Sequence, residues 1–114
     1  MHNRTIQRRK ATKYKWQKIQ REQGFSPEEC WNLDCTIIQF VLPRLKYFAK
    51  HTISYPARYS YDTYIKMLNE IVYGFELYLE NKYWYVDNPK REEQMQAVDK
   101  AFKQFADLFC DLWD

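Results

Sequence analysis

The hydrophobic residues of the chain recur at three- and four-residue intervals, which is the spacing of amphipathic α-helices. One such stripe, within residues 89–112, consists of Met95, Val98, Phe102, Phe105, Phe109 and Leu112. Another, within residues 61–81, consists of Tyr64, Ile65, Leu68, Ile71, Val72, Phe75, Tyr78 and Leu79. Each stripe predicts a long helix with one buried face. Pro89 should stand in the first turn of the later helix, and Gly74 indicates a close approach of a neighbouring helix to the earlier one.

The segment from Ser26 to Lys50 carries the widest apolar arc in the chain. Ser26, Pro27 and Glu29 form the pattern of a helix N-terminus with a capping box. Few polar positions interrupt the arc, so we expect neighbouring helices to enclose this helix and to make it the centre of the fold. Pro43 lies inside it and removes one backbone hydrogen bond.

Residues 4–22 are rich in helix-forming side chains and are followed by Gly24, a common stop residue. We expect this helix to be anchored by Trp16 and Ile19. The chain has only two glycines and four prolines, too few for the many tight turns of a β-sandwich or barrel. The predicted fold is all-α: a compact bundle of three long helices over residues 25–114, preceded by a basic N-terminal helix or arm over residues 1–24.

The net charge of +3 hides an uneven distribution. Residues 1–22 hold eight basic residues and one acid, whereas the remainder holds ten basic and fourteen acidic residues. Such an arm is a solvated tail or a surface that contacts nucleic-acid phosphates. In the second interpretation the contacts would come from Arg4, Arg8, Arg9, Lys13, Lys15, Trp16 and Lys18, with the indole stacking on bases.

Two charged residues stand inside the apolar arc of the second helix, Asp34 and Arg44. We expect both to be buried, and Asp34 above all, because it falls near the middle of the arc. A buried carboxylate needs a donor, and Arg44, Arg58 or a Tyr hydroxyl are the candidates. Either the pair fixes helix packing, or the two residues lie in a groove that receives a ligand or partner.

Several short sequence words in the middle of the chain form one pattern. They are Trp31-Asn32-Leu33-Asp34, Thr36-Ile37, Phe40, Leu42-Pro43-Arg44-Leu45, Phe48, Tyr55-Pro56 and Phe75. This pattern, over about residues 25–80, resembles small helical proteins encoded by bacteriophages. The resemblance implies a phage origin and a place of action in the host cytoplasm, and it brings no activity with it.

The sequence contains no catalytic motif. A Gly-rich phosphate loop is impossible with two glycines, and the two histidines, His2 and His51, form no metal-ligand cluster with the cysteines. We therefore expect no enzyme activity, no cofactor and no metal site. No apolar run reaches the ~20 residues of a membrane span, so no membrane association is expected.

Aromatic residues make up 18% of the chain, more than a core of this size requires. Aromatic and Arg side chains dominate the energetics of protein interfaces. The candidate partner-binding residues, in the connectors, are Tyr55, Arg58, Tyr59, Tyr83, Trp84 and Tyr85. The leading hypothesis is a non-enzymatic phage interaction protein that acts on a host or defence factor, with inhibition of bacterial immunity as its concrete form.

Other partners are also open at this stage. A phage protein or a second copy of the chain, giving a homodimer, would use the same aromatic residues. Nucleic acid would use residues 1–22. A small nucleotide-like ligand would use Arg44, Arg58 and Tyr side chains.

Overall fold

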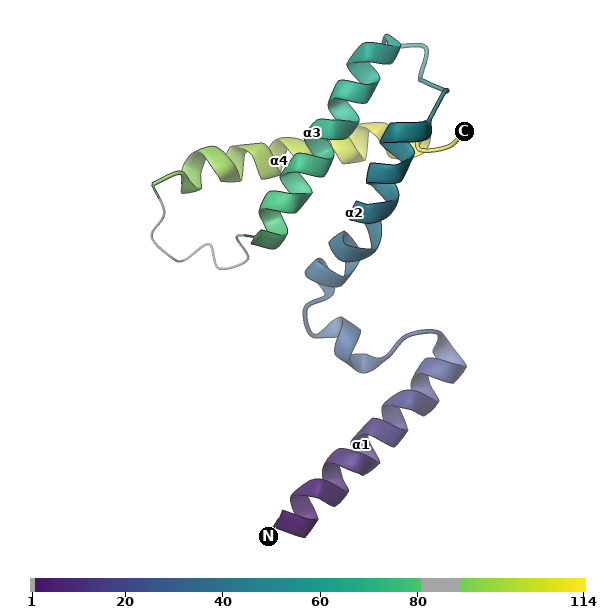
Figure 1. Cartoon of the computed structure of the whole chain (residues 1–114), viewed down its shortest axis with the longest axis vertical. Helices are drawn as coiled ribbons and strands as arrows, with labels where there is room; N and C mark the ends of the chain where they lie inside the picture. The colour runs from purple at the N-terminus through teal and green to yellow at the C-terminus, as the bar shows by residue number, and fades with distance from the viewer. Residues whose placement is uncertain (1, 81–88) are drawn as a thin grey trace. The chain divides into compact units, whose positions relative to one another are not determined.

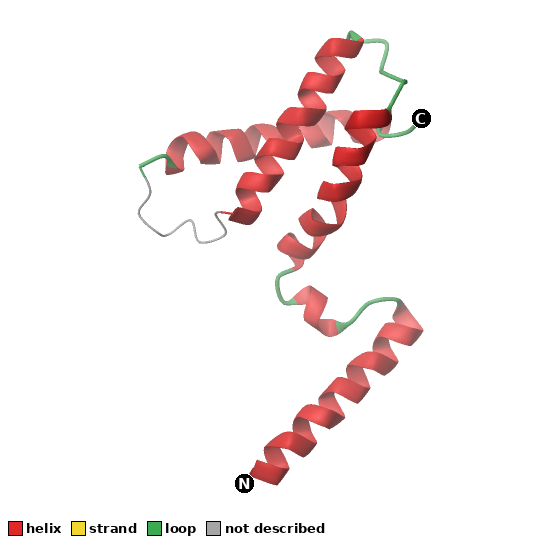
Figure 2. Cartoon of the chain, viewed as in Figure 1, coloured by secondary structure: helices red, strands yellow, loops and turns green. Residues whose placement is uncertain are grey.

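The computed structural model describes residues 2–80 and 89–114, with side chains from Lys13 onwards. Every regular element in these ranges is helical, and they contain no strand (Figure 1, Figure 2). The all-α prediction is confirmed. None of the described helices is both long and apolar enough to cross a membrane. The contacts between residues divide the chain into two compact units, residues 1–37 and residues 38–114. The division falls inside the helix that spans Leu33–His51. The domain boundary expected after residue 24 stays a prediction.

In the first unit, helix α1 spans His2–Gln23 and ends at Gly24 as predicted. Gly24 has a φ of +83°, a left-handed conformation that glycine adopts without strain, and its N–H donates to Gln20 O at 2.8 Å. Trp16 is half-buried, and its ring packs edge to face against Trp31 with centroids 5.1 Å apart. Trp16, which we expected to anchor this helix, therefore contacts another residue of the first unit.

The second predicted helix does not begin at Ser26 as one continuous element. Glu29 Oε2 accepts a 2.7 Å hydrogen bond from Ser26 N–H, but this cap starts only the 3₁₀ turn η1, Pro27–Cys30. The hydroxyl of Thr36 donates to Glu29 O at 2.8 Å. In a continuous α-helix that carbonyl would accept from the N–H of Leu33. Helix α2 accordingly begins after a turn and spans Leu33–His51.

In the second unit, α2 contributes one buried face, made by Ile38, Leu42, Leu45 and Ala49. Helix α3 spans Tyr61–Glu80, and Thr63 N–H donates to Ser60 Oγ at 3.2 Å as its N-terminal cap. Its buried residues are Tyr64, Leu68, Ile71, Gly74, Phe75 and Leu77, several of them without any exposed surface. The helix at the centre of the core is therefore α3, and the expectation that α2 would be central is wrong.

Helix α4 spans Arg91–Leu108 and is followed by the 3₁₀ turn η2, Phe109–Asp111. It begins after a turn at Pro89 rather than at Pro89 itself. Its buried residues are Val98, Ala101 and Leu108, whereas Met95, Phe102 and Phe109 of the predicted stripe are exposed. The stripe is therefore only partly covered by the rest of the second unit.

Helices α3 and α4 cross, as Figure 1 shows, and Gly74 lies where they meet. A Cβ atom at this glycine would overlap the Cβ of Ala101 and lie 2.9 Å from Ala97 O. The close approach predicted from the sequence is confirmed. Ion pairs reinforce the packing on either side of α3, between Lys46 and Glu76 and between Lys100 and Glu70.

Candidate functional site

The connector between α2 and α3 carries three of the predicted contact residues, and two of them bind within the chain. Arg58 Nη2 donates to Asp111 Oδ2 at 2.6 Å and to Asp107 O at 3.0 Å. The hydroxyl of Tyr59 donates to Asp107 Oδ2 at 2.8 Å. The hydrogen bond to Asp111 raises the pKa of Arg58 above its usual value, so the guanidinium stays charged. Arg58 and Tyr59 thus fix the connector to the C-terminal end of α4.

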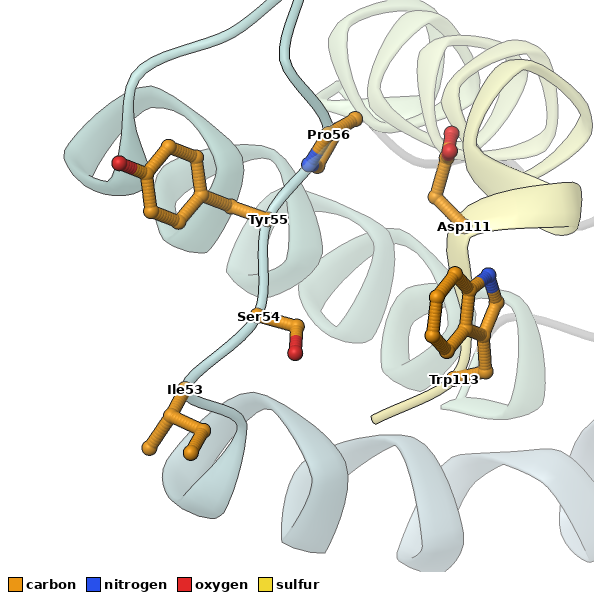
Figure 3. Close-up of a pocket in the computed structure, with 6 residues that line it drawn as sticks. All are labelled: Ile53, Ser54, Tyr55, Pro56, Asp111 and Trp113. Atoms are coloured by element: carbon orange, nitrogen blue, oxygen red, sulfur yellow. The ribbon is translucent and has the colours of Figure 1, made fainter.

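Tyr55, the third predicted contact residue of this connector, is 53% exposed. It lines a pocket of about 350 Å³ together with Ile53, Ser54, Pro56, Asp111 and Trp113. Figure 3 shows Asp111 and Trp113 facing the connector, while the ring of Tyr55 turns away from Trp113. The Tyr55 ring instead packs edge to face on Tyr61, with centroids 5.9 Å apart. The remaining predicted contacts, Tyr83, Trp84 and Tyr85, lie outside the described residues.

The side chain of Asp114 binds the first residues of the same connector. Its Oδ1 accepts hydrogen bonds from the buried hydroxyl of Thr52 at 2.6 Å and from Ser54 N–H at 3.3 Å. The hydrogen bond from Thr52 holds the pKa of Asp114 below its ordinary value of 3.8, since it stabilises the carboxylate. This contact, which we call the Asp114 anchor, joins residues far apart in the sequence and was not predicted.

Acidification is expected to release the Asp114 anchor. Because the pKa of Asp114 is lower in the folded chain, the stabilisation is fully present above about pH 4 and is lost as the pH falls through the depressed pKa. An NMR titration of the Ser54 amide should show this transition below pH 3.8. The Asp114→Asn variant should show no such step, and a midpoint at or above the ordinary aspartate value would contradict the prediction.

Asp34 and Arg44 are both exposed, so the expectation that they would be buried is wrong. Asp34 lies in the first turn of α2, where a carboxylate is favoured by the positive end of the helix dipole. Arg44 lies further along the same helix, on its solvent side, and borders a groove.

That groove lies between α2 and the C-terminal part of the chain, and we call it the α2–α4 groove. It holds about 290 Å³ and is lined by Phe40, Val41, Arg44, Leu45, Phe48, Phe105, Phe109 and Leu112. Phe40 and Phe109 are 60% and 62% exposed. Arg44 is the sole charged residue among those that line it. The groove is thus an apolar surface with one cation at its edge.

The guanidinium of Arg44 is held in place by its own helix. Nη1 donates to Phe40 O at 2.8 Å, and the carbon Cζ lies 3.8 Å from the centroid of the Phe40 ring. This combination of a hydrogen bond and a cation–π contact fixes the plane of the side chain. The Nε and Nη2 donors of Arg44 lie along a different edge of the guanidinium from the Nη1 donor that binds Phe40 O.

The apolar surface continues along α2 beyond the groove. Tyr47 is 67% exposed, and its ring stacks on His51 with centroids 4.0 Å apart. His51 Nδ1 also lies 2.9 Å from Tyr47 O. The sequence led us to expect that neighbouring helices would enclose this helix, and within residues 38–114 that expectation is wrong.

The residues proposed for nucleic-acid contact all belong to α1. Lys13, Lys15 and Lys18 are exposed, and none of them forms an ion pair with a described acidic residue. The ring of Trp16 packs against that of Trp31, so part of its surface is already covered. The side chains of Arg4, Arg8 and Arg9 lie outside the described part of the structure.

Within the described residues, no group of three or more His, Cys, Asp or Glu side chains is arranged to hold a metal ion. Comparison of the chain with protein-family models, with curated proteins and with solved structures gave no match.

Proposed function

We propose that this chain is a non-enzymatic interaction protein that binds another protein through the exposed apolar face of α2 and the adjoining groove. The observation that carries the proposal is that α2 has apolar residues on both sides, and only one side is covered. Phe40 and Tyr47 are each more than half exposed, although the opposite face of the same helix is buried in the core. A helix that is apolar all round is normally enclosed by neighbours.

The energetics favour a protein as the missing neighbour. Burying apolar surface contributes about 25 cal/mol per Å² removed from water, and Phe and Tyr are among the largest side chains. Aromatic and Arg residues at the centre of an interface commonly provide most of its affinity. Phe40, Arg44, Tyr47 and Phe109 supply this combination next to one groove.

The partner class follows from the resemblance of residues 25–80 to phage proteins. Occupying a host surface needs no catalytic chemistry, so a host or defence factor in the host cytoplasm is the proposed target. The proposal also treats α2, α3 and α4 as a compact bundle, since a rigid bundle presents a docking face at low entropic cost.

The proposal predicts a specific loss of binding when the exposed aromatic residues of α2 are removed. The doubly substituted variant Phe40→Ser, Tyr47→Ser should capture its partner from nuclease-treated host lysate at least about tenfold less efficiently than the original chain, because a lost hot-spot residue costs ~2 kcal/mol or more. Quantitative mass spectrometry of the captured proteins measures the difference.

Tyr73→Ser is the matched control, because Tyr73 is an equally exposed aromatic residue on α3. Capture by this variant should equal that of the original chain. If the α2 variant captures the same protein equally well, or if the chain converts a substrate, the proposal is wrong. Capture that disappears on nuclease treatment would instead favour the nucleic-acid alternative through Lys13, Lys15 and Lys18, which are exposed on α1.

A further inference from the structure

We propose that the α2–α4 groove binds an amphipathic helix of the partner protein, and that a carboxylate on this helix pairs with Arg44. The inference rests on the proposed function and deepens it, because it names the chemistry of the segment that the groove receives. Three features of the groove lead to it: its charge, the position of the Arg44 donors and the absence of a free backbone edge in its lining.

The first feature is the charge at the groove. Arg44 forms no ion pair with any described acidic residue, and no acidic residue lines the groove. Two lysines of the same unit are neutralised, Lys46 by Glu76 and Lys100 by Glu70. A cation left unpaired at the edge of an apolar surface favours a partner that brings an anion to this point.

The second feature is the orientation of the guanidinium. Nη1 is engaged by Phe40 O, and the ring of Phe40 lies against one face of the guanidinium. The Nε and Nη2 donors form a planar fork that matches the two oxygens of a carboxylate. Because the side chain is already held, pairing costs less conformational entropy than it would for a free arginine.

The third feature is the backbone that borders the groove. Its lining residues belong to α2, α4 and the turn η2, except Leu112, which follows that turn, so most of their N–H and C=O groups are bonded within helices. An extended peptide would bring its own backbone polar groups against phenylalanine rings and leave them without partners. A helix satisfies its backbone internally and presents only side chains, as in other helix-in-groove interactions.

The test uses the full chain and a pair of synthetic amphipathic peptides of about eighteen residues, or five helical turns. Each has leucines along one face, and a residue beside this face is Glu in one peptide and Gln in the other. The Glu peptide should bind about tenfold more tightly by calorimetry, because a bidentate charge-assisted pair is lost in the Gln peptide. Arg44→Gln should abolish this difference, whereas the control Lys66→Gln, an exposed lysine on α3, should retain it.

Each other result overturns a defined part of the inference. Equal binding of both peptides, lost in Phe109→Ser, would disprove the carboxylate pair and leave the apolar docking face of the proposed function intact. Equal binding of a proline-containing version of the Glu peptide would disprove the helical occupant. The inference as a whole would be overturned if neither peptide bound, or if the chain associated with itself and Phe109→Ser abolished this association. The capture experiment with the Phe40 and Tyr47 variant tests the proposed function separately.

Discussion

Replacing Gly74 by valine is expected to lower the free energy of unfolding by about 3 kcal/mol, at the upper end of the usual cost of overpacking. Any Cβ at this position overlaps the Cβ of Ala101 and approaches Ala97 O to 2.9 Å, and backbone atoms of α4 cannot move aside as a flexible side chain can. Helices α3 and α4 must therefore separate, which opens the core around them. Urea denaturation followed by circular dichroism measures the loss.

The clash can be tested from both sides of the crossing. Gly74→Ala should also destabilise the fold, although alanine is the better helix former by about 1 kcal/mol in an exposed helix. Adding Ala101→Gly to Gly74→Ala should recover part of this loss, because it removes one of the two overlapping Cβ atoms. A Gly74→Val variant that unfolds at the same urea concentration as the original chain would show that the two helices do not meet at this glycine.

Replacing Phe75 by alanine is expected to cost about 4 kcal/mol, the usual range for a fully buried phenylalanine. Its side chain is 2% exposed, and its ring meets those of Phe102 and Phe105 at centroid distances of 5.1 and 5.3 Å. Truncation removes this burial and leaves a cavity between α3 and α4. The loss should appear as a lower midpoint in urea, with little change in the slope.

Tyr73→Ala provides the control from the neighbouring position of the same helix. Its side chain is mostly exposed, so we expect a loss of less than about 1 kcal/mol. A similar loss in both variants would mean that the two faces of α3 are equally covered, contrary to the buried and exposed pattern of the helix. A loss below about 1.5 kcal/mol in Phe75→Ala would contradict its place in the core.

The helical fold was largely accessible from the sequence, because hydrophobic spacing reports the helix period directly. The bounds of α3 and the stop at Gly24 agree with prediction. The start of α2 does not, since Ser26 and Glu29 form a cap that serves a 3₁₀ turn as well as an α-helix. A capping pattern identifies the first turn but carries no information about the turns that follow it.

The candidate site was less accessible, because a sequence shows which residues are apolar and not which of them are covered. The wide arc of α2 suggested a central helix with a buried Asp34, but α3 occupies the centre and Asp34 is exposed. Arg58 and Tyr59 have the composition of interface contacts, yet they bind Asp107 and Asp111 within the chain. Arg and Tyr side chains can anchor a connector within the chain or bind a partner protein by the same hydrogen bonds and ion pairs. Only the folded structure shows which of the two they do.

The crossing of α3 and α4 also constrains how this protein can evolve. Gly74 and the Cβ of Ala101 share one small volume, so a larger residue at either position requires a smaller one at the other or a wider spacing of the helices. Glycine at position 74 has no smaller replacement, and drift at position 101 is limited to residues no larger than alanine while the helices keep this spacing. Among diverged copies of this gene, these two positions should change together or not at all, while the exposed face of α2 is free to follow a changing partner.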